Sequence, residues 1–223
     1  MSEDKQLDLF NGELDRKSML TDPKIPIPLG TYNTMEEVQK DCNQCYRCDL
    51  AKKRTNAVIG RGNPQAKIMI IGEGPGQQED EQGLPFVGRS GQLLENILES
   101  VELNSDRDVY ISNVIRCRPP HNRTPIAKEI QACKPYLLEQ IRLVNPKIIL
   151  LTGAVAVRTV TGDRRGISKI RGEWMEWEGR LCMAIYHPAY LLRNSSKEPG
   201  KPKWLMWQDI QKVRAKLDEL SQV

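Results

Sequence analysis

The chain has 223 residues, of which 39% are hydrophobic, and 33 basic against 29 acidic residues give it a net charge of +4 at pH 7. This length can bury a full core as one domain, and the modest positive charge allows a polyanionic partner without demonstrating one. No apolar run approaches the ~20 residues of a membrane span, and the N-terminal MSEDKQLDLF lacks the cationic start and apolar stretch of a signal peptide. We therefore expect a soluble, cytoplasmic protein.

Residues 1–33 are polar, weakly periodic and interrupted by prolines, which predicts a flexible tail ahead of a domain at residues 34–223. The tail contains a short motif, Gln6, Leu7, Asp8, Leu9 and Phe10, that matches the bacterial sliding-clamp pentapeptide Q-L-[S/D]-L-F. An extended segment of this kind would place its Leu-Phe pair in an apolar pocket, so the match predicts binding to the clamp. Because short motifs arise by chance, an amphipathic tail that packs on its own domain is the alternative.

Disulfides are rare in cytosolic proteins, so a metal site explains most of the six cysteines better than cross-links do. Three of them form a C-x2-C-x2-C run within a helical pattern over Met35–Leu50, and two more lie 16 residues apart. These five are Cys42, Cys45, Cys48, Cys117 and Cys133. Such a set suits a four-thiolate site for zinc or for an iron–sulfur cluster, and the spacing does not choose between them. A set of buried, inert thiols is the alternative. Cys182 lies in an apolar run and is predicted to be a core residue.

Four short apolar runs predict strands, namely Lys67–Ile71, Val109–Ser112, Lys147–Leu151 and Leu181–Tyr186. Helical periodicity alternates with them over Gly91–Val101, Ile126–Val144, Gly153–Val160 and Trp204–Leu220. This alternation predicts an α/β fold. A polar or glycine-rich segment follows each strand: GEGPG from residue 72, NVIRC from 113, TGA from 152 and HPAYLLR from 187. Because ligands bind at the carboxyl ends of the strands in open parallel sheets, these segments predict one shared active site.

These segments resemble the family 4 uracil-DNA glycosylases, the iron–sulfur branch of that superfamily. The resemblance runs from about Cys45 to Asp209 and keeps the order and spacing of four blocks. The blocks are Gly72–Gly76 with Glu79 and Asp80, Gly83–Gly88 with Gly91, Asn113–Pro120 with Asn122 and Arg123, and His187 with Pro188. The resemblance implies a single-domain three-layer α/β/α sandwich around a four-stranded parallel sheet. It also implies a DNA repair enzyme that hydrolyses the N-glycosidic bond of uracil and leaves an abasic site.

The same resemblance implies a [4Fe–4S] cluster whose ligands are Cys45, Cys48, Cys117 and Cys133. Cys42 is then a spare thiol, but it stands in the same spacing to Cys45 as Cys45 does to Cys48, so the choice of the first pair stays open. The implied partner is uracil-containing DNA, single- or double-stranded, bound by a monomer that associates with the nucleoid.

The resemblance also implies roles for three residues in reading a base that has been swung out of the stack. Phe86 would contact the flat face of uracil, and Asn113 would donate to O4 and accept from N3–H. His187 would donate to O2 and so stabilise the leaving uracil. The structural alternatives are that Phe86 plugs its loop onto the core and that Asn113 satisfies local backbone groups.

Glu73 is the candidate residue for positioning the attacking water, with Glu79 behind it, and Gly74 and Glu79 are candidate substrate-binding residues. The implied DNA contacts are Pro188, Leu191, Leu192 and Arg193, with Leu191 or Leu192 filling the gap left by the flipped nucleotide. A sister branch attacks the sugar with a loop histidine, but the loop around His121 lacks that branch's basic insertion, which favours hydrolysis.

Two other functions fit parts of the pattern. A glycosylase of the same fold could act on another deaminated base such as hypoxanthine, although Asn113 favours uracil. A non-enzymatic iron–sulfur module for DNA binding or electron transfer would not need Phe86, Asn113 and His187 in their places.

Overall fold

The computed structural model describes residues 13–221, so the predicted clamp motif at residues 6–10 lies outside the described part of the chain. Its centre is a six-stranded sheet in the order β1-β3-β2-β4-β6-β5. The strands are β1 (Arg61–Gly62), β2 (Ile68–Gly72), β3 (Val109–Asn113), β4 (Ile148–Thr152), β5 (Trp174–Trp177) and β6 (Arg180–Ile185). The four strands predicted from apolar runs are β2, β3, β4 and β6, and they pair in parallel as expected.

The two edge strands are antiparallel and were not predicted, so the expected four-stranded sheet is only the centre of a mixed one. β5 pairs with β6 as a hairpin whose two turn residues, Glu178 and Gly179, both have positive φ angles of 48° and 72°. Such a turn matches the twist of the flanking strands. β1 has two residues and is defined by its pairing with β3 rather than by any pattern of its own.

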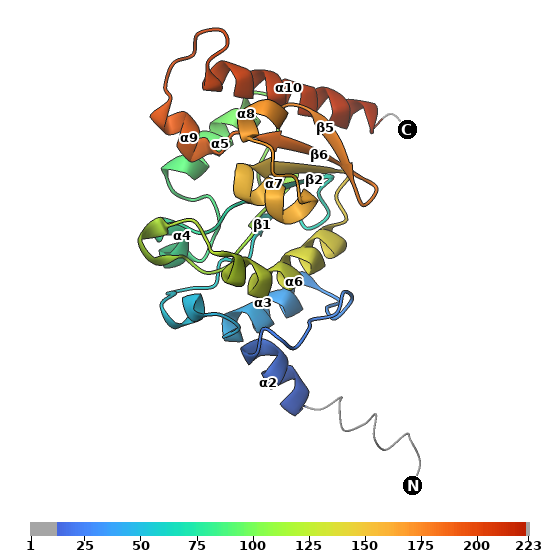
Figure 1. Ribbon diagram of the computed structural model, residues 1–223. Helices are drawn as coiled ribbons and strands as arrows, with labels where there is room; N and C mark the ends of the chain where they lie inside the picture. The colour runs from blue at the N-terminus through green and yellow to red at the C-terminus, as the bar shows by residue number, and fades with distance from the viewer. Residues whose placement is uncertain (1–12, 222–223) are drawn as a thin grey trace.

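Helices cover both faces of the sheet, in the three-layer arrangement that the family resemblance implies (Figure 1). On one face the core is closed by α5 (Arg89–Glu99), α9 (Pro188–Arg193) and α10 (Pro202–Glu219). On the other it is closed by α6 (Ala127–Val144), α7 (Ala154–Thr161) and α8 (Ile167–Ile170). Alternate residues of a strand point to opposite faces of the sheet. In β2, Ile68 and Ile70 pack in the core beneath α5, α9 and α10, and Met69 and Ile71 pack in the core on the opposite face. Within residues 13–221, no helix is long and apolar enough to cross a membrane.

The N-terminal part of the described chain is packed, in contrast to the flexible tail predicted for residues 1–33. It forms α2 (Glu13–Thr21), and Leu20, Ile27 and Tyr32 are buried against the helices beneath them. The buried guanidinium of Arg47 holds this segment, donating to the carbonyl oxygens of Asp22 at 3.1 Å and Ile25 at 2.8 Å. Such long-range hydrogen bonds leave no periodic signal in the sequence.

The predicted helix over Met35–Leu50 is wrong in its second half. Helix α3 (Met35–Gln44) ends where Cys45 takes an extended backbone conformation with ψ of 131°, and a short 3-10 turn, η2 (Asp49–Lys52), follows. Two further short elements lie in loops, α4 (Gln77–Gln82) and η3 (Pro120–Asn122). The break after α3 allows three thiols of this segment to line one cavity.

Candidate active site

A cleft of about 790 Å³ opens at the carboxyl ends of the parallel strands. The segments after β2, β3 and β6 contribute to its lining, as predicted, whereas the segment from Thr152 after β4, which was also predicted to join the site, is not part of that lining. The cleft brings together Glu73 and Gly74 from the loop after β2, Asn113 from the end of β3, and His187 from the start of α9. Phe86 joins them from the loop between α4 and α5. Residues more than 100 positions apart in the chain therefore face one space.

The Phe86 ring lies beside the imidazole of His187, with ring centroids 5.8 Å apart and planes inclined by 28°. Its backbone has a φ angle of 54°, a left-handed conformation that costs energy for a residue with a side chain. The turn is made possible by Gly91, because any Cβ there would overlap the Phe86 carbonyl group. Phe86 is 7% exposed and packs with core residues. It therefore serves both the core and the wall of the cleft.

Gly72, the last residue of β2, separates Phe86 from Asn113. A Cβ on Gly72 would lie 2.7 Å from two ring carbons of Phe86 and closer still to Asn113 Oδ1. Asn113 is 2% exposed, and no hydrogen bond from residues 13–221 reaches its side-chain amide. Both the donor and the acceptor of that amide are consequently available to a ligand in the cleft.

His187 is held in one tautomer by the helix that it caps. Its Nδ1 accepts a hydrogen bond from the Ala189 backbone N–H at 3.2 Å, so the proton of the neutral ring lies on Nε2. Burial lowers the pKa of His187 to about 4, and the charge of Arg193 acts in the same direction. At neutral pH the ring is therefore uncharged and presents one N–H donor, which suits it to stabilise a developing negative charge.

The two candidate carboxylates differ in what they already bind. Glu79 Oε2 accepts from the Gly76 N–H at 3.1 Å, and Oε1 accepts from Val87 and Gly88 N–H groups at 3.1 and 2.9 Å. Glu79 thus ties the glycine-rich loop to the loop that carries Phe86. Glu73 lines the cleft, and partial burial raises the pKa of its carboxyl group, while a hydrogen bond with Thr124 opposes that shift. Of the two, Glu73 has the freer carboxylate.

Helix α9 changes the expected DNA contacts. Leu191 is 1% exposed and packs in the core with Met206 and Ile210, contrary to the prediction that it can enter the base stack. The reason is helical spacing, which turns Pro188 and Leu191 inward together, and Leu192 is partly buried. Tyr190 faces the cleft instead and is 38% exposed. Tyr190 was not predicted from the sequence, although its spacing from Arg193 is that of two residues on one face of a helix.

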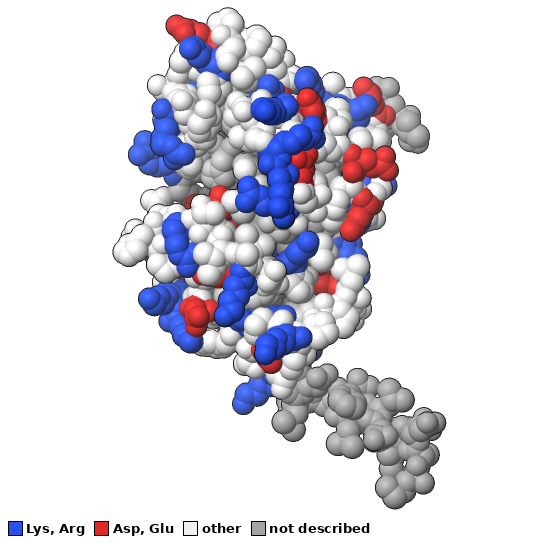
Figure 2. Space-filling view, in the orientation of Figure 1, with Lys and Arg blue, Asp and Glu red and all other residues white. Residues whose placement is uncertain are grey.

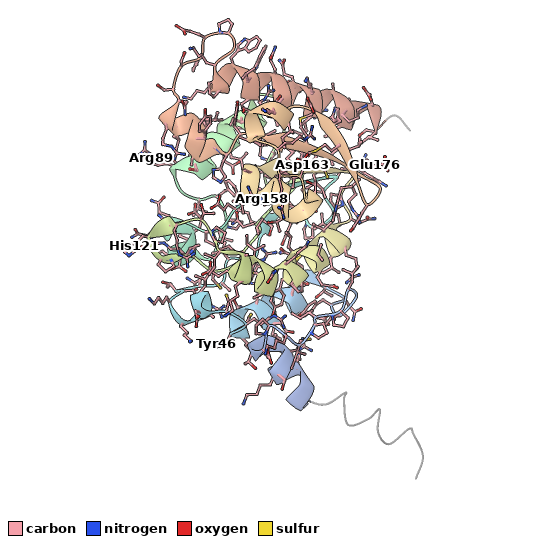
Figure 3. All side chains as sticks on the ribbon, in the orientation of Figure 1. Tyr46, Arg89, His121, Arg158, Asp163 and Glu176 are labelled. Carbon is pink, nitrogen blue, oxygen red and sulfur yellow. The ribbon has the colours of Figure 1, made fainter. Side chains whose placement is uncertain are left out.

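Three cationic side chains line the cleft, Arg89, Arg123 and Arg193. Arg123 pairs with Glu129 at 2.6 Å, whereas within residues 13–221 neither Arg89 nor Arg193 forms an ion pair. Figure 2 shows Lys and Arg side chains along the left edge of the molecule, both above and below its mid-height. Arg89 and the exposed His121 both lie on this side, near α9 and α4 (Figure 3). The free cations can contact phosphates on a polyanion that covers the cleft.

A second, smaller cavity contains the thiols of the predicted metal site. The cysteines that line it are Cys42, Cys45, Cys48, Cys117 and Cys133. Three arginine side chains, of Arg47, Arg54 and Arg116, also line it, and Arg54 Nη1 lies 3.2 Å from Cys117 Sγ. In the described residues, no three His, Cys, Asp or Glu side chains are grouped closely enough to hold a single metal ion. Thiolates with cationic neighbours fit an anionic iron–sulfur cluster. Cys182 is fully buried in the core, as predicted.

Comparison with known proteins identifies the family of this chain. The family model of the uracil DNA glycosylase superfamily matches residues 59–211. The chain is 43% identical over 183 residues to a type-4 uracil-DNA glycosylase of Thermotoga maritima. The aligned residues cover 81% of this chain and 93% of that relative. A type-4 uracil-DNA glycosylase of Sulfurisphaera tokodaii is 39% identical over 191 residues, or 82% and 84% of the two chains. That of Archaeoglobus fulgidus is 38% identical over 167 residues, or 71% and 83%.

Proposed function

The chain belongs to the uracil-DNA glycosylase superfamily and, within it, to the type-4 enzymes that excise uracil from DNA, and from this premise we propose how its cleft performs the reaction. The observation that carries the proposal is the tautomer of His187. A neutral imidazole with its Nδ1 occupied has one donor left, Nε2–H, beside the aromatic ring of Phe86. A flipped uracil that stacks on Phe86 can receive that donor at O2.

Recognition of uracil rests on Asn113 in this proposal. Its amide N–H donates to O4 and its carbonyl oxygen accepts from N3–H. Cytosine presents the reverse pattern, with a donor at C4 and an acceptor at N3, and would leave the buried amide mismatched. Leaving buried polar groups unpaired costs about 1–3 kcal/mol each. Burial of Asn113 and the absence of competing partners within residues 13–221 support this role.

Hydrolysis of the N-glycosidic bond then needs a water molecule that reaches the sugar carbon from which uracil departs. As the C–N bond lengthens, negative charge collects on uracil and positive charge on the sugar. His187 stabilises the first, and we assign to Glu73 the positioning of the attacking water. The carboxylate of Glu79 is already bound to three backbone N–H groups, so its role is to hold the two loops together.

Replacing Glu73 with Gln should remove most turnover on uracil DNA while binding persists, because the amide keeps the size of the side chain but loses its charge. The measurement is single-turnover cleavage of an oligonucleotide with one uracil, followed by alkaline cleavage at the abasic site. A matched inosine oligonucleotide serves as the specificity control. Undiminished turnover would remove Glu73 from the mechanism, and cleavage of inosine alone would favour the hypoxanthine alternative.

Tyr190 is the residue that we propose to fill the gap left by the flipped nucleotide. Tyr190→Ala should lower kcat/KM about tenfold on double-stranded uracil DNA, because aromatic stacking on a base contributes ~1–3 kcal/mol. The loss should be smaller on single-stranded DNA, where no partner strand has to be kept stacked. Trp207→Ala removes an aromatic side chain of similar exposure, 48%, from α10 outside the cleft and is the matched control. Equal losses on both substrates would contradict the role of Tyr190.

The type-4 enzymes are the iron–sulfur group of the superfamily, and we propose that this chain holds a [4Fe–4S] cluster through Cys45, Cys48, Cys117 and Cys133. These cysteines come from the segment after α3, the loop after β3 and helix α6, so a bound cluster would tie these three parts together. No step of the hydrolysis passes through it. Cys42, which is 1% exposed in the same cavity, is the spare thiol. Cys42→Ser should therefore keep the iron content of the purified protein, whereas Cys117→Ser should lower it.

We also propose that Gln6–Phe10 recruits the enzyme to a bacterial sliding clamp. Support comes from the sequence motif alone, which lies outside the described residues. Changing both Leu9 and Phe10 to Ala should abolish pull-down by the clamp and leave cleavage of free uracil oligonucleotides unchanged. The double variant Gln6→Ala with Asp8→Ala tests whether the polar positions matter for register. Clamp pull-down that survives the Leu9 and Phe10 changes would defeat this proposal.

A further inference from the structure

Arg116 lies between the base-reading cleft and the thiol cavity. It follows Asn113 by three residues and directly precedes Cys117. Its side chain is 2% exposed and is among the largest that are fully buried in the protein. The mechanism described above does not use this residue, so its burial needs another explanation.

At one end, the guanidinium holds the backbone of the base-reading loop. Nη1 donates to the carbonyl oxygen of Asn113, and Nη2 donates to Gln140 Oε1. Gln140 is itself fixed, since its Nε2 donates to the Ile59 carbonyl oxygen at 3.0 Å and to the Tyr110 hydroxyl at 3.2 Å. A displacement of Arg116 would therefore release the Asn113 carbonyl rather than carry Gln140 with it.

The same side chain also lines the cavity that contains the thiols, and no carboxylate of the described residues serves as its counterion. Within residues 13–221 it forms no ion pair, and its buried Nε has no hydrogen-bond partner. Arginine remains protonated in proteins, and a buried charge without a partner is strongly destabilising. Arg116 lines the cavity with Cys117 and Cys133.

We propose that Arg116 is a positioning residue that couples the iron–sulfur cluster to base recognition. The anionic, thiolate-bound cluster is the counterion of its guanidinium, and the guanidinium in turn fixes the Asn113 loop that reads uracil. The inference rests on the proposed roles of Asn113 and the cluster. It gives the cluster an effect on substrate preference without any electron transfer or any step in the hydrolysis.

Arg54 provides a matched control, because it is another cation that lines the same cavity and it contacts one of the thiols. Its Nη1 contacts Cys117 Sγ, and its Nη2 donates to the Asn43 carbonyl oxygen at 2.6 Å. No hydrogen bond in the described chain links Arg54 to Asn113. Arg54→Gln should therefore weaken retention of the cluster without altering base recognition in molecules that still hold it.

The experiment uses the full-length, cluster-loaded protein and two readouts. The first is the lifetime of the cluster's visible absorbance in the presence of an iron chelator. The second is the ratio of affinities for two oligonucleotides, one carrying a non-hydrolysable 2′-fluoro-deoxyuridine and one carrying 2′-fluoro-deoxycytidine, whose base edge has the reverse donor and acceptor pattern, at the same position. Arg116→Gln should shorten the cluster lifetime and lower the affinity ratio about tenfold, within the ~5–150-fold range of coupling between sites. Arg54→Gln should change only the lifetime.

Arg116→Lys keeps the charge but not the paired donors, so it should keep the cluster lifetime and lower the affinity ratio, and it remains informative if Arg116→Gln does not fold. Wild-type protein stripped of its cluster should also show the lower ratio. A ratio that stays at the wild-type value in both Arg116 variants would overturn the coupling. A wild-type, loaded protein with no preference for the uracil analogue would instead overturn the proposed role of Asn113, so the two failures are distinguishable.

Discussion

Replacing His187 with Ala is expected to lower kcat by about 10²–10³-fold, the usual effect of removing one preorganised donor to a developing anion. The Nε2–H acts on charge that exists only in the transition state, so KM should change little. The measurement is single-turnover cleavage of a single-uracil oligonucleotide. His121→Ala is the matched control, because it removes the other histidine from an exposed position, and its rate should stay within a few-fold of wild type.

His187 should also contribute to the pH dependence of the stability of the wild-type protein, and the His187→Ala variant should lose that contribution. The pKa of His187 is about 4 in the folded protein and ~6.5 in an unfolded chain. Between these values the unfolded state binds more protons, so the free energy of unfolding falls as the pH drops from 6.5 to 4 and is fully retained above 6.5. At 1.36 kcal/mol per pKa unit, the loss is about 3 kcal/mol. Urea unfolding of His187→Ala should lack this part of the pH dependence.

A catalytic role for a charged His187 would give the opposite results. The wild-type rate would fall as the pH rises through 6 and 7, and the two proteins would lose stability in parallel on acidification. With a neutral His187 ring, we expect that the protonation of His187 does not change kcat between about pH 6 and 7. The hydrogen bond from Ala189 N–H to Nδ1 carries the argument, because a proton on Nδ1 would break it.

The parallel centre of the sheet was predictable because each of its strands is a buried apolar run bounded by special residues. The edges were not, for two different reasons. β1 (Arg61–Gly62) is too short for a pattern, and β5 (Trp174–Trp177) is followed by a Glu-Gly turn rather than by one of the common hairpin pairs. The packing of the segment after α2 was not predictable from its own sequence, because its carbonyl groups accept hydrogen bonds from Arg47, which lies far along the chain.

Positions at strand ends were predictable in the candidate site, whereas the roles of side chains were less so. Asn113 and His187 follow buried strands, and the topology of an α/β sheet brings such residues to one edge. The sequence cannot tell that Glu79 is bound to two loops at once, since its partners are backbone groups. It also cannot give the rotation of the short helix α9, which buries Leu191, predicted to contact DNA, and exposes Tyr190, for which nothing was predicted.

Gly72→Ala is expected to lower kcat/KM by at least about 10²-fold, the effect that a misplacement of ~1 Å can have on a preorganised site. The added Cβ would lie 2.7 Å from the Phe86 ring and would also meet Asn113 Oδ1, so the ring and the amide cannot both keep their places. No atom of His187 is among the three nearest contacts of the added Cβ, so the proposed donor keeps its place. The loss should therefore appear in binding of the uracil analogue as well as in turnover.

Gly166→Ala is the matched control, because a Cβ at that position meets no atom within 4 Å and its φ angle of −64° suits any residue. Both variants should unfold at temperatures near that of the wild type, since Phe86 and Asn113 border the cleft and can move into it. A Gly72→Ala protein with normal activity would mean that the flipped base is not held between these two side chains. Lost binding with an unchanged melting temperature would instead tie uracil recognition to the spacing that one glycine allows at the end of β2.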